Sequence, residues 1–285
     1  MAAEEKELKV SFLSKREYEC PACGAKFRKE ELLSGGGRLI AGPMTEELHR
    51  VYEPSIKYGE IFPLVYQATV CPECWFAAMD QDFEGLNDEG VNSAREDREN
   101  RCKDARRLYP PLDFSSPRGL AEGAVSQYLL MRCYQYYDGA FSPTIKQGLA
   151  ALRAAWLFDD MDRKTPKQHY DWLALLFRRK AQFLYNEAIR LEQTGKETLS
   201  AMKIFGPDTD KNYAYEGVLY LCAYLRLKFG PSGAGQRRQS LEEARRTIAK
   251  IFGMGKTSKN KPGPLLDRAR QVHDAINKEL NESDE

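Results

Sequence analysis

Two cysteine pairs constrain this chain more than any other feature. Cys20 and Cys23 form the first pair, Cys71 and Cys74 form the second, and each pair reads Cys-Pro-x-Cys. Two such turns can bring four thiolates around one Zn²⁺ at Zn–S distances of about 2.3 Å. The intervening segment of 47 residues has room for strands and a loop. The spacing therefore predicts one structural zinc ion per chain, with these four cysteines as its ligands.

The residues around the first pair suit a metal-binding turn. Gly24 follows Cys23 and can adopt the left-handed backbone conformation that closes such a turn. In a short Cys-Pro-x-Cys turn, backbone amides can point at the sulfurs and offset their negative charge. A four-thiolate site has no open coordination position. We therefore expect this site to stabilise a small, loop-rich region and not to catalyse a reaction.

Two alternatives to zinc remain open for the cysteine pairs. A thioredoxin-like redox site needs only one pair, at a strand end in a β-α-β pattern, whereas this chain has two pairs and no such pattern. Buried inert thiols are the second alternative, although proline and polar residues flank both pairs. The remaining cysteines, Cys102, Cys133 and Cys222, are predicted to be core or surface residues.

Charge and hydropathy limit the class of protein. The 285 residues include 43 Lys and Arg and 42 Asp and Glu, for a formal net charge of +1, which argues against a protein that coats nucleic acid. We expect no membrane span, because no apolar run is long enough, and no signal peptide, because the N-terminus lacks an apolar segment. A cytoplasmic location is therefore predicted, and thiols stay reduced there.

The sequence changes character near residue 87. Before it lie short β-prone segments, including 38–42 and 62–70, and after it the pattern is helical almost throughout. The fold class is predicted to be mainly α, with a small zinc-ribbon-like β region at the N-terminus followed by a TPR-like helical-hairpin array or a helical bundle. Three regions are predicted: a zinc-ribbon-like domain at 1–87, a charged helix and proline-rich connection at 88–117, and a TPR-like helical domain at 118–285.

Several helices of the third region carry sequence signals that mark where they begin. Thr165 before Pro166 is typical of an N-cap followed by proline at the first helical position, and Ser240 with Glu243 matches a capping box. Small and large apolar residues alternate at helical spacing, which favours close pairing of neighbouring helices. The predicted helices cover residues 120–138, 144–161, 166–194, 210–229, 240–252 and 264–281.

The cysteine region also resembles a known family. The stretches "CPACGAKF", "GRLIAG" and "YEPSIKYGEIFPLVYQATVCPECWFAAMDQDF" are similar to those of an uncharacterised bacterial family of unknown function, which pairs a double CPxC region with TPR-like helices. The resemblance is clearest over residues 18–83 and weaker to about 229. It implies that the four cysteines are metal ligands. It also implies a glycine after the fourth cysteine, where this chain has Trp75, so we expect a tilted second turn or weaker metal binding.

No set of catalytic residues is evident. His49, His169 and His273 are dispersed, and none lies near a cysteine or serine motif that would predict a nucleophilic triad. Gly255–Thr257 matches the end of a phosphate-binding loop, but Lys250 occupies the position of the required first glycine and the preceding segment is helical. We therefore expect no enzymatic activity.

The favoured hypothesis is a non-catalytic interaction protein. As a scaffold or adaptor, its helical surface would bind a protein partner or a second copy. Tyrosine suits such surfaces because it loses little entropy on ordering and has both an apolar face and a hydroxyl, although core packing is the alternative for each one. The tyrosines on predicted helices are Tyr128, Tyr134, Tyr136, Tyr137, Tyr170, Tyr213, Tyr215, Tyr220 and Tyr224.

Two other hypotheses are kept. The first is a zinc-ribbon protein that binds RNA or DNA, although interleaved glutamates weaken the positive field around the first cysteine pair. The basic residues there are Lys15, Arg16, Lys26, Arg28, Lys29 and Arg38. The second is an unrecognised metal-dependent enzyme, which needs an open metal site of which the sequence shows no sign.

Overall fold

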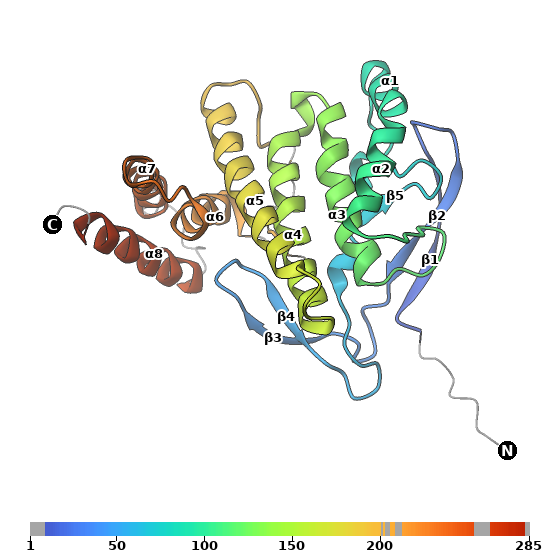
Figure 1. Ribbon diagram of the computed structural model, residues 1–285, viewed down its shortest axis with the longest axis horizontal. Coiled ribbons are helices and arrows are strands. Elements are labelled where there is room, and N and C mark those ends of the chain that lie inside the picture. Colours follow the sequence, from blue (N-terminus) through green and yellow to red (C-terminus); the bar gives the residue numbers. More distant parts are fainter. Residues whose placement is uncertain (1–8, 201, 203–205, 209–212, 254–262, 283–285) are drawn as a thin grey trace. The chain divides into compact units, whose positions relative to one another are not determined.

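The computed structural model describes residues 9–200, 202, 206–208, 213–253 and 263–282. Over these residues the chain is mainly helical, with eight α-helices and three two-stranded antiparallel sheets in the N-terminal part (Figure 1). The predicted fold class is therefore confirmed. Packing divides the chain into two units. They comprise Met1–Thr45 with His49–Tyr137, and Glu46–Leu48 with Asp138–Glu285.

The first unit contains all three strand pairs. They are β1 (Ser11–Glu19) with β2 (Lys26–Leu32), β3 (Ile40–Met44) with β4 (Arg50–Glu53), and β5 (Ala68–Val70) with β6 (Ala77–Met79). The strand predicted over 62–70 is only partly right, because Pro63–Tyr66 forms a 3-10 helix and the strand begins at Ala68. Proline fixes φ and cannot donate to a strand ladder, so this segment coils before the strand starts.

The charged segment after residue 87 forms two helices where one was predicted. They are α1 (Asp88–Glu96) and α2 (Arg98–Leu108). The Asn87 side chain caps α1 by accepting a hydrogen bond from Gly90 N at 2.8 Å. Asp97 separates the two helices, and its carboxylate accepts a hydrogen bond from Arg132 at 2.8 Å. The predicted boundaries at residues 87 and 117 stay a prediction about separate domains, and both lie inside the first unit.

A third helix completes the first unit. The helix α3 (Leu120–Cys133) ends earlier than the predicted residue 138, because Tyr134–Tyr136 tightens into a 3-10 turn. Gly123 allows α3 to approach the 3-10 helix at Pro63–Tyr66 closely, since a Cβ there would lie 2.7 Å from Val65 Cγ2.

No helix among the described residues of either unit is long and apolar enough to cross a bilayer.

An aromatic cluster forms part of the core of the first unit. Tyr18 stacks on Phe27 with ring centroids 5.8 Å apart, and Phe83 packs against Phe27 at 5.6 Å. Phe76 extends the cluster, at 5.4 Å from Phe83. Tyr18 lies two residues before the first cysteine pair, and Phe76 two residues after the second. The cluster therefore joins the hairpins that carry the two pairs, through contacts that aromatic rings favour.

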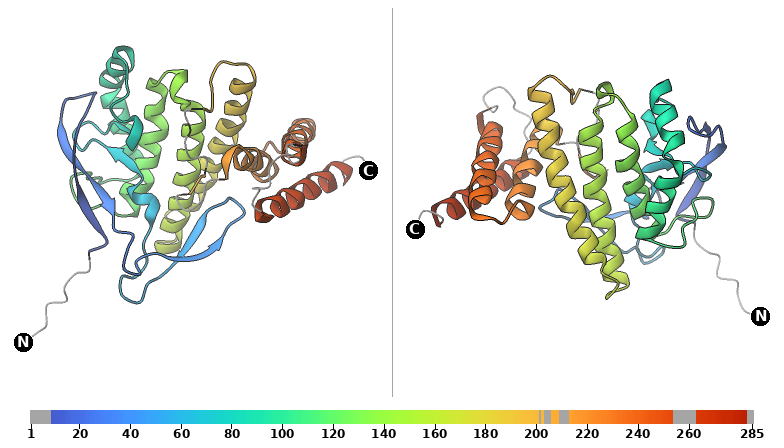
Figure 2. Two further views of the ribbon diagram at one scale, coloured as in Figure 1. Left: turned by 180° about the vertical axis from the view of Figure 1, so that it is seen from behind. Right: turned by 45° about the horizontal axis from the view of Figure 1, so that its top comes forward.

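The second unit is a succession of helices. They are α4 (Pro143–Lys164), α5 (Tyr170–Gln193), α6 (Ala214–Phe229), α7 (Ala234–Gly253) and α8 (Gly263–Glu282). Each packs against the next along the chain, and α6 also contacts α8. Figures 1 and 2 show α4 and α5 side by side in antiparallel directions. This order suits a helical-hairpin array or a bundle, and the TPR type itself stays a prediction.

Two helix starts in the second unit differ from the prediction. Thr165 ends α4, donating its backbone N–H to Met161 O at 2.8 Å, and α5 begins only at Tyr170. The helix α7 begins at Ala234, so Ser240 and Glu243 lie inside it and the predicted capping box is wrong. Good helix formers such as glutamine and arginine precede Ser240 and extend the helix upstream. The predicted start of α6 at 210 and the stretch at 255–257 lie outside the described residues.

A buried carboxylate contributes to the second unit. Glu47 accepts hydrogen bonds from Trp156 Nε1 at 2.5 Å and from Arg178 Nε at 2.7 Å. Arg178 also pairs with Asp159. Because a buried charge is tolerated only when it is paired and hydrogen-bonded, this network holds α4 and α5 in one arrangement.

The tyrosines on the predicted helices follow the core-packing alternative and do not form a recognition surface. None of the nine tyrosines is exposed, and six are buried, because aromatic rings on helices that pack on both sides enter the core. The buried ones are Tyr134, Tyr136, Tyr137, Tyr213, Tyr220 and Tyr224.

Candidate metal centre

Each cysteine pair lies in the turn of a β-hairpin. Cys20 and Cys23 follow β1 and precede β2. Gly24 N donates to Cys20 O at 2.8 Å, and Cys20 N donates to Ala25 O at 2.9 Å. These two bonds close a compact turn that points both side chains to the same side. Gly24 has φ +74°, in the left-handed region that the sequence predicts for it.

The second turn repeats this geometry between β5 and β6. Trp75 N donates to Cys71 O at 3.0 Å, and Cys71 N donates to Phe76 O at 2.9 Å. Trp75 takes φ +56°, although it carries a Cβ, which costs about 1 kcal/mol or more. The hydrogen bonds match those of the first turn within 0.2 Å, so the predicted tilt is not seen. The predicted loss of metal affinity stays a prediction.

Packing around Trp75 compensates for its backbone conformation. The ring meets Phe114 edge to face with centroids 5.5 Å apart, and the Arg106 guanidinium lies 4.6 Å from the indole centroid. Trp75 is buried. Aromatic pairs and cation–π contacts of this kind contribute about 0.5–1.5 kcal/mol each, so they offset the strain that a glycine would avoid.

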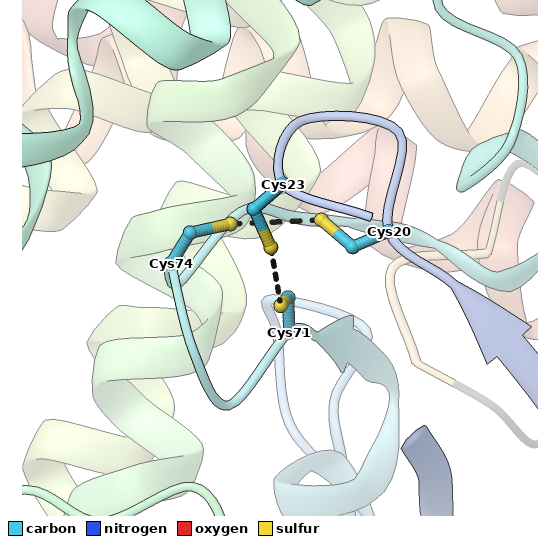
Figure 3. Close-up of side chains that lie close together, drawn as sticks. All are labelled: Cys20, Cys23, Cys71 and Cys74. Atoms are coloured by element: carbon cyan, nitrogen blue, oxygen red, sulfur yellow. Dashed lines mark hydrogen bonds between the residues drawn. The ribbon is translucent and has the colours of Figure 1, made fainter. Parts of the chain in front are cut away.

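The two turns bring the four sulfurs together (Figure 3). Cys20 Sγ lies 3.5 Å from Cys74 Sγ, and Cys23 Sγ lies 3.6 Å from Cys71 Sγ. All four sulfurs lie within 4.8 Å of one another, and all four cysteines are free thiols. A tetrahedral site with Zn–S bonds of about 2.3 Å separates its sulfurs by about 3.8 Å. The cluster therefore has the size of a mononuclear four-thiolate site.

The cluster is mostly shielded from solvent. Cys20, Cys71 and Cys74 are buried, and Cys23 is exposed. Hydrogen bonds from Cys20 and Cys71 lower the pKa of Cys74, while hydrogen bonds to Cys71 and Cys74, together with burial, raise the pKa of Cys20 above its usual value. One thiolate is stabilised at the expense of its neighbours. Four thiolates within 4.8 Å of one another would repel one another, so a bound cation would favour full ionisation of the cluster.

Three arginines from α1 and α2 contact the cysteine turns. Arg95 Nε donates to Ala22 O of the first turn at 2.8 Å. Arg98 donates to Glu73 O of the second turn at 3.0 Å. Sequence reasoning missed these contacts because it treated this segment as solvated. Arg95, Arg98 and Arg101 recur every third residue on adjoining helices, and this regular spacing is the signal that could have found them.

Arg101 is the most unusual of the three because it is fully buried, with 0% exposure. Its guanidinium donates to Cys74 O at 2.9 and 3.3 Å, to Ala94 O at 2.9 Å, and to the Tyr136 hydroxyl at 3.3 Å. All of these acceptors are neutral. A buried cation needs negative charge nearby. Asp97, which accepts a hydrogen bond from the Tyr136 hydroxyl, supplies part of it, and a metal-bound set of four thiolates would add to it.

The other predicted residues do not join the cluster. Cys133 is buried and accepts a hydrogen bond from Ala77 N at 3.4 Å, and Cys222 is buried in the second unit. His169 is exposed, and His49 and His273 are half-buried in different units. Within the described part of the chain, the four-cysteine cluster is the one group of three or more Cys, His, Asp or Glu side chains close enough to share a metal ion.

Known proteins resemble this chain along almost its whole length. Residues 13–276 match the family described as an uncharacterized protein conserved in bacteria (DUF2225). The chain belongs to this family. An uncharacterized protein of Borreliella burgdorferi is 40% identical over 273 residues, which cover 95% of this chain and 98% of that protein. No solved structure matches the chain.

Family membership confirms the resemblance that the cysteine turns indicate. The matched residues include all four cysteines and reach from β1 into α8. The family is therefore defined by both parts of the chain, and its description assigns no activity to either.

Proposed function

We propose that this protein is a non-catalytic, metal-stabilised interaction protein, a scaffold or adaptor, with one structural Zn²⁺ held by its four clustered cysteines. The observation that supports this proposal most strongly is the cysteine cluster, in which two hairpins separated in sequence direct four sulfurs toward one point. Four protein ligands fill a tetrahedral shell and leave no position for substrate or water. A metal ion held there would therefore stabilise the fold and would not bind a substrate.

The donor set supports zinc as the ion. Soft thiolates in a tetrahedral arrangement suit zinc or iron. Sulfur separations of 3.5 and 3.6 Å between the hairpins fit one ion and leave no room for a multi-iron cluster. Zinc is also redox-inert, which suits a site with a structural role. A bound zinc ion would join the β1–β2 and β5–β6 hairpins and hold the cysteine turns against α1 and α2.

The interaction role rests on the second unit. Its helices pack in succession, which leaves the outward faces of individual helices free for a partner. The nucleic-acid alternative is weaker than the sequence indicates, because Lys29 is buried and pairs with Asp80 at 3.6 Å. The enzyme alternative lacks an open metal site among the described residues.

Two measurements test this proposal. Protein purified under reducing conditions should contain one zinc and no iron, and in-cell crosslinking with mass spectrometry should recover the same protein partner in independent preparations. Folded protein without metal would refute the structural role of the site. A chain that yields only monomers and no reproducible crosslinked partner would refute the interaction role.

A further inference from the structure

The helix α5 has two faces with different surroundings. One face is buried in the second unit and carries Ala174, Phe177, Ala181, Leu184 and Ala188. The opposite face carries three large apolar side chains in contact with solvent. Trp172 is 57% exposed, Leu176 is 36% exposed and Phe183 is 57% exposed. Single exposed apolar residues are common, but three aligned on one helix form a patch.

The spacing of this exposed face is that of a helix–helix interface. Trp172, Leu176, Arg179 and Phe183 are separated by four, three and four residues. This alternation keeps side chains aligned along one seam, which is how a helix contacts a second helix. We call these four residues the α5 stripe. The buried face of α5, which already packs against α4, has the same kind of spacing.

The charge beside the middle of the stripe is positive. The nearest carboxylates on the helix lie at the two ends of the stripe, Asp171 before Trp172 and Glu187, which pairs with Arg190, after Phe183. Arg179 and Lys180 are exposed. The Lys180 ammonium lies 5.6 Å from the Phe183 ring centroid, so it borders the apolar surface. A partner that covers the apolar side chains would also meet these two cations, and acidic side chains on that partner would match them.

A groove continues this surface beyond Phe183. It has a volume of about 750 Å³ and is lined by residues of α5, α6 and α7. Phe183 lies on its wall, together with Arg246 and Lys250 of α7. Both of these cations are exposed. The basic character of the stripe therefore extends into the groove, whose other charged lining residues include the Arg226–Glu243 ion pair.

We propose that the α5 stripe binds an amphipathic helix of a partner protein, with apolar residues at alternating spacings of three and four and acidic residues beside them. This inference rests on the proposed interaction role and names its surface and the chemistry of the partner. The apolar side chains anchor the helix, and Arg179, Lys180 and the groove cations select acidic flanks.

The positive charge of the α5 stripe argues against two other occupants, a second copy of the chain and a membrane. If two copies paired through their α5 stripes in antiparallel orientation, Arg179 and Lys180 of both copies would lie close together along the interface, and like charges there are destabilising. A membrane-bound helix keeps its charges on the polar face. Here Arg179 lies within the seam, between Leu176 and Phe183.

The test uses two synthetic helical peptides and the zinc-loaded full chain. Both peptides carry leucine at alternating spacings of three and four, one with glutamate flanks and one with lysine flanks. Binding is followed by anisotropy of a labelled peptide at moderate salt. We expect the acidic peptide to bind at least about tenfold more tightly than the basic one. Equal affinities, or no binding of the acidic peptide, would overturn the proposal.

Variants of the chain locate the contact. Reversing both stripe cations in R179E/K180E should weaken acidic-peptide binding by about tenfold or more and improve binding of the basic peptide. Lys278→Glu, at an exposed position on α8, serves as the matched control and should change neither. Phe183→Ser should weaken both peptides. Unchanged far-UV circular dichroism shows that these exposed substitutions leave the fold intact, and unchanged affinities in the folded variants would refute the assignment.

Further measurements separate this inference from the proposed function. Photo-crosslinkers placed at positions 172 and 183, with position 278 as the control, report which surface meets a partner in cells. Reproducible partner crosslinks that lie outside α5 would keep the interaction role and refute the stripe. Stripe-dependent binding to phosphatidylglycerol vesicles, or stripe-dependent self-association in sedimentation, would also refute it in favour of a membrane or a second copy.

Discussion

Replacing the buried Arg101 tests how the helices are coupled to the metal centre. Arg101→Met keeps most of the side-chain length and removes the charge and all donors. Cys74 O and Ala94 O then lose a buried donor, at about 1–3 kcal/mol for each acceptor. Part of this cost is regained because a guanidinium no longer has to be desolvated. We therefore expect the zinc-loaded protein to lose about 3 kcal/mol of unfolding free energy.

Charge adds a second, metal-specific effect. Four thiolates and one Zn²⁺ carry a net charge of −2, and the Arg101 guanidinium lies against the backbone of the second cysteine turn. Removing this cation should lower zinc affinity about tenfold, as is typical of groups just outside the ligand shell. Competition with a chromogenic chelator measures the affinity, and urea denaturation of the zinc-loaded protein measures the stability.

An exposed arginine on the same helix provides the control. Arg98→Met removes a hydrogen bond of 3.0 Å to Glu73 O at an exposed side chain. It should cost less than about 1 kcal/mol. If Arg101→Met destabilises the protein but leaves zinc affinity unchanged, Arg101 acts through packing and hydrogen bonds alone and the charge argument is wrong. A stability loss no larger than that of Arg98→Met would refute the burial argument as well.

Three other perturbations have defined outcomes. Glu47→Gln breaks the buried pair with Arg178 and should lower the denaturation midpoint, at a cost of about 3 kcal/mol; an unchanged midpoint would contradict this. Trp75→Gly relieves the left-handed strain but loses the ring contacts, so calorimetry should show a net loss of about 2 kcal/mol, whereas a gain would mean that strain dominates. Burial opposes ionisation of Asp80, but the Tyr18 hydrogen bond and nearby cations hold its pKa below 3.8. The ionised carboxylate therefore stabilises the fold fully above that pH, and this stabilisation is lost on acidification. Asp80→Asn should accordingly reduce the fall of unfolding free energy with decreasing pH.

The sequence predicts the features that depend on local chemistry. The form of each cysteine pair predicts its turn, since each turn needs only six consecutive residues to close. The repeat of the same Cys-Pro-x-Cys form predicts that the four sulfurs cluster. The 3.6-residue pattern predicts most of the helices, and α8 agrees within one residue at each end. Trp75 takes the backbone conformation that a glycine was expected to provide, because the turn hydrogen bonds determine it.

Features that depend on tertiary packing were not predictable in the same way. The capping signals at Thr165 and Ser240 are locally reasonable, but Thr165 ends one helix instead of starting the next, and Ser240 lies inside a helix that begins at Ala234. Six of the nine tyrosines are buried and the other three are half-buried, which depends on how the elements pack and not on the local sequence. Arg101 looks like one charge among many in its segment, and only the approach of the second cysteine turn makes it a buried cation.

The central claim is that the four cysteines hold one structural zinc ion. The most direct measurement is the metal content of the purified full chain by mass spectrometry, together with far-UV circular dichroism, for the native protein and for Cys71→Ser. We expect one zinc per native chain, and in the variant a loss of zinc together with loss of folded structure in the first unit. A native chain that is folded without zinc, or a variant that loses zinc and keeps its full structure and stability, would contradict the claim.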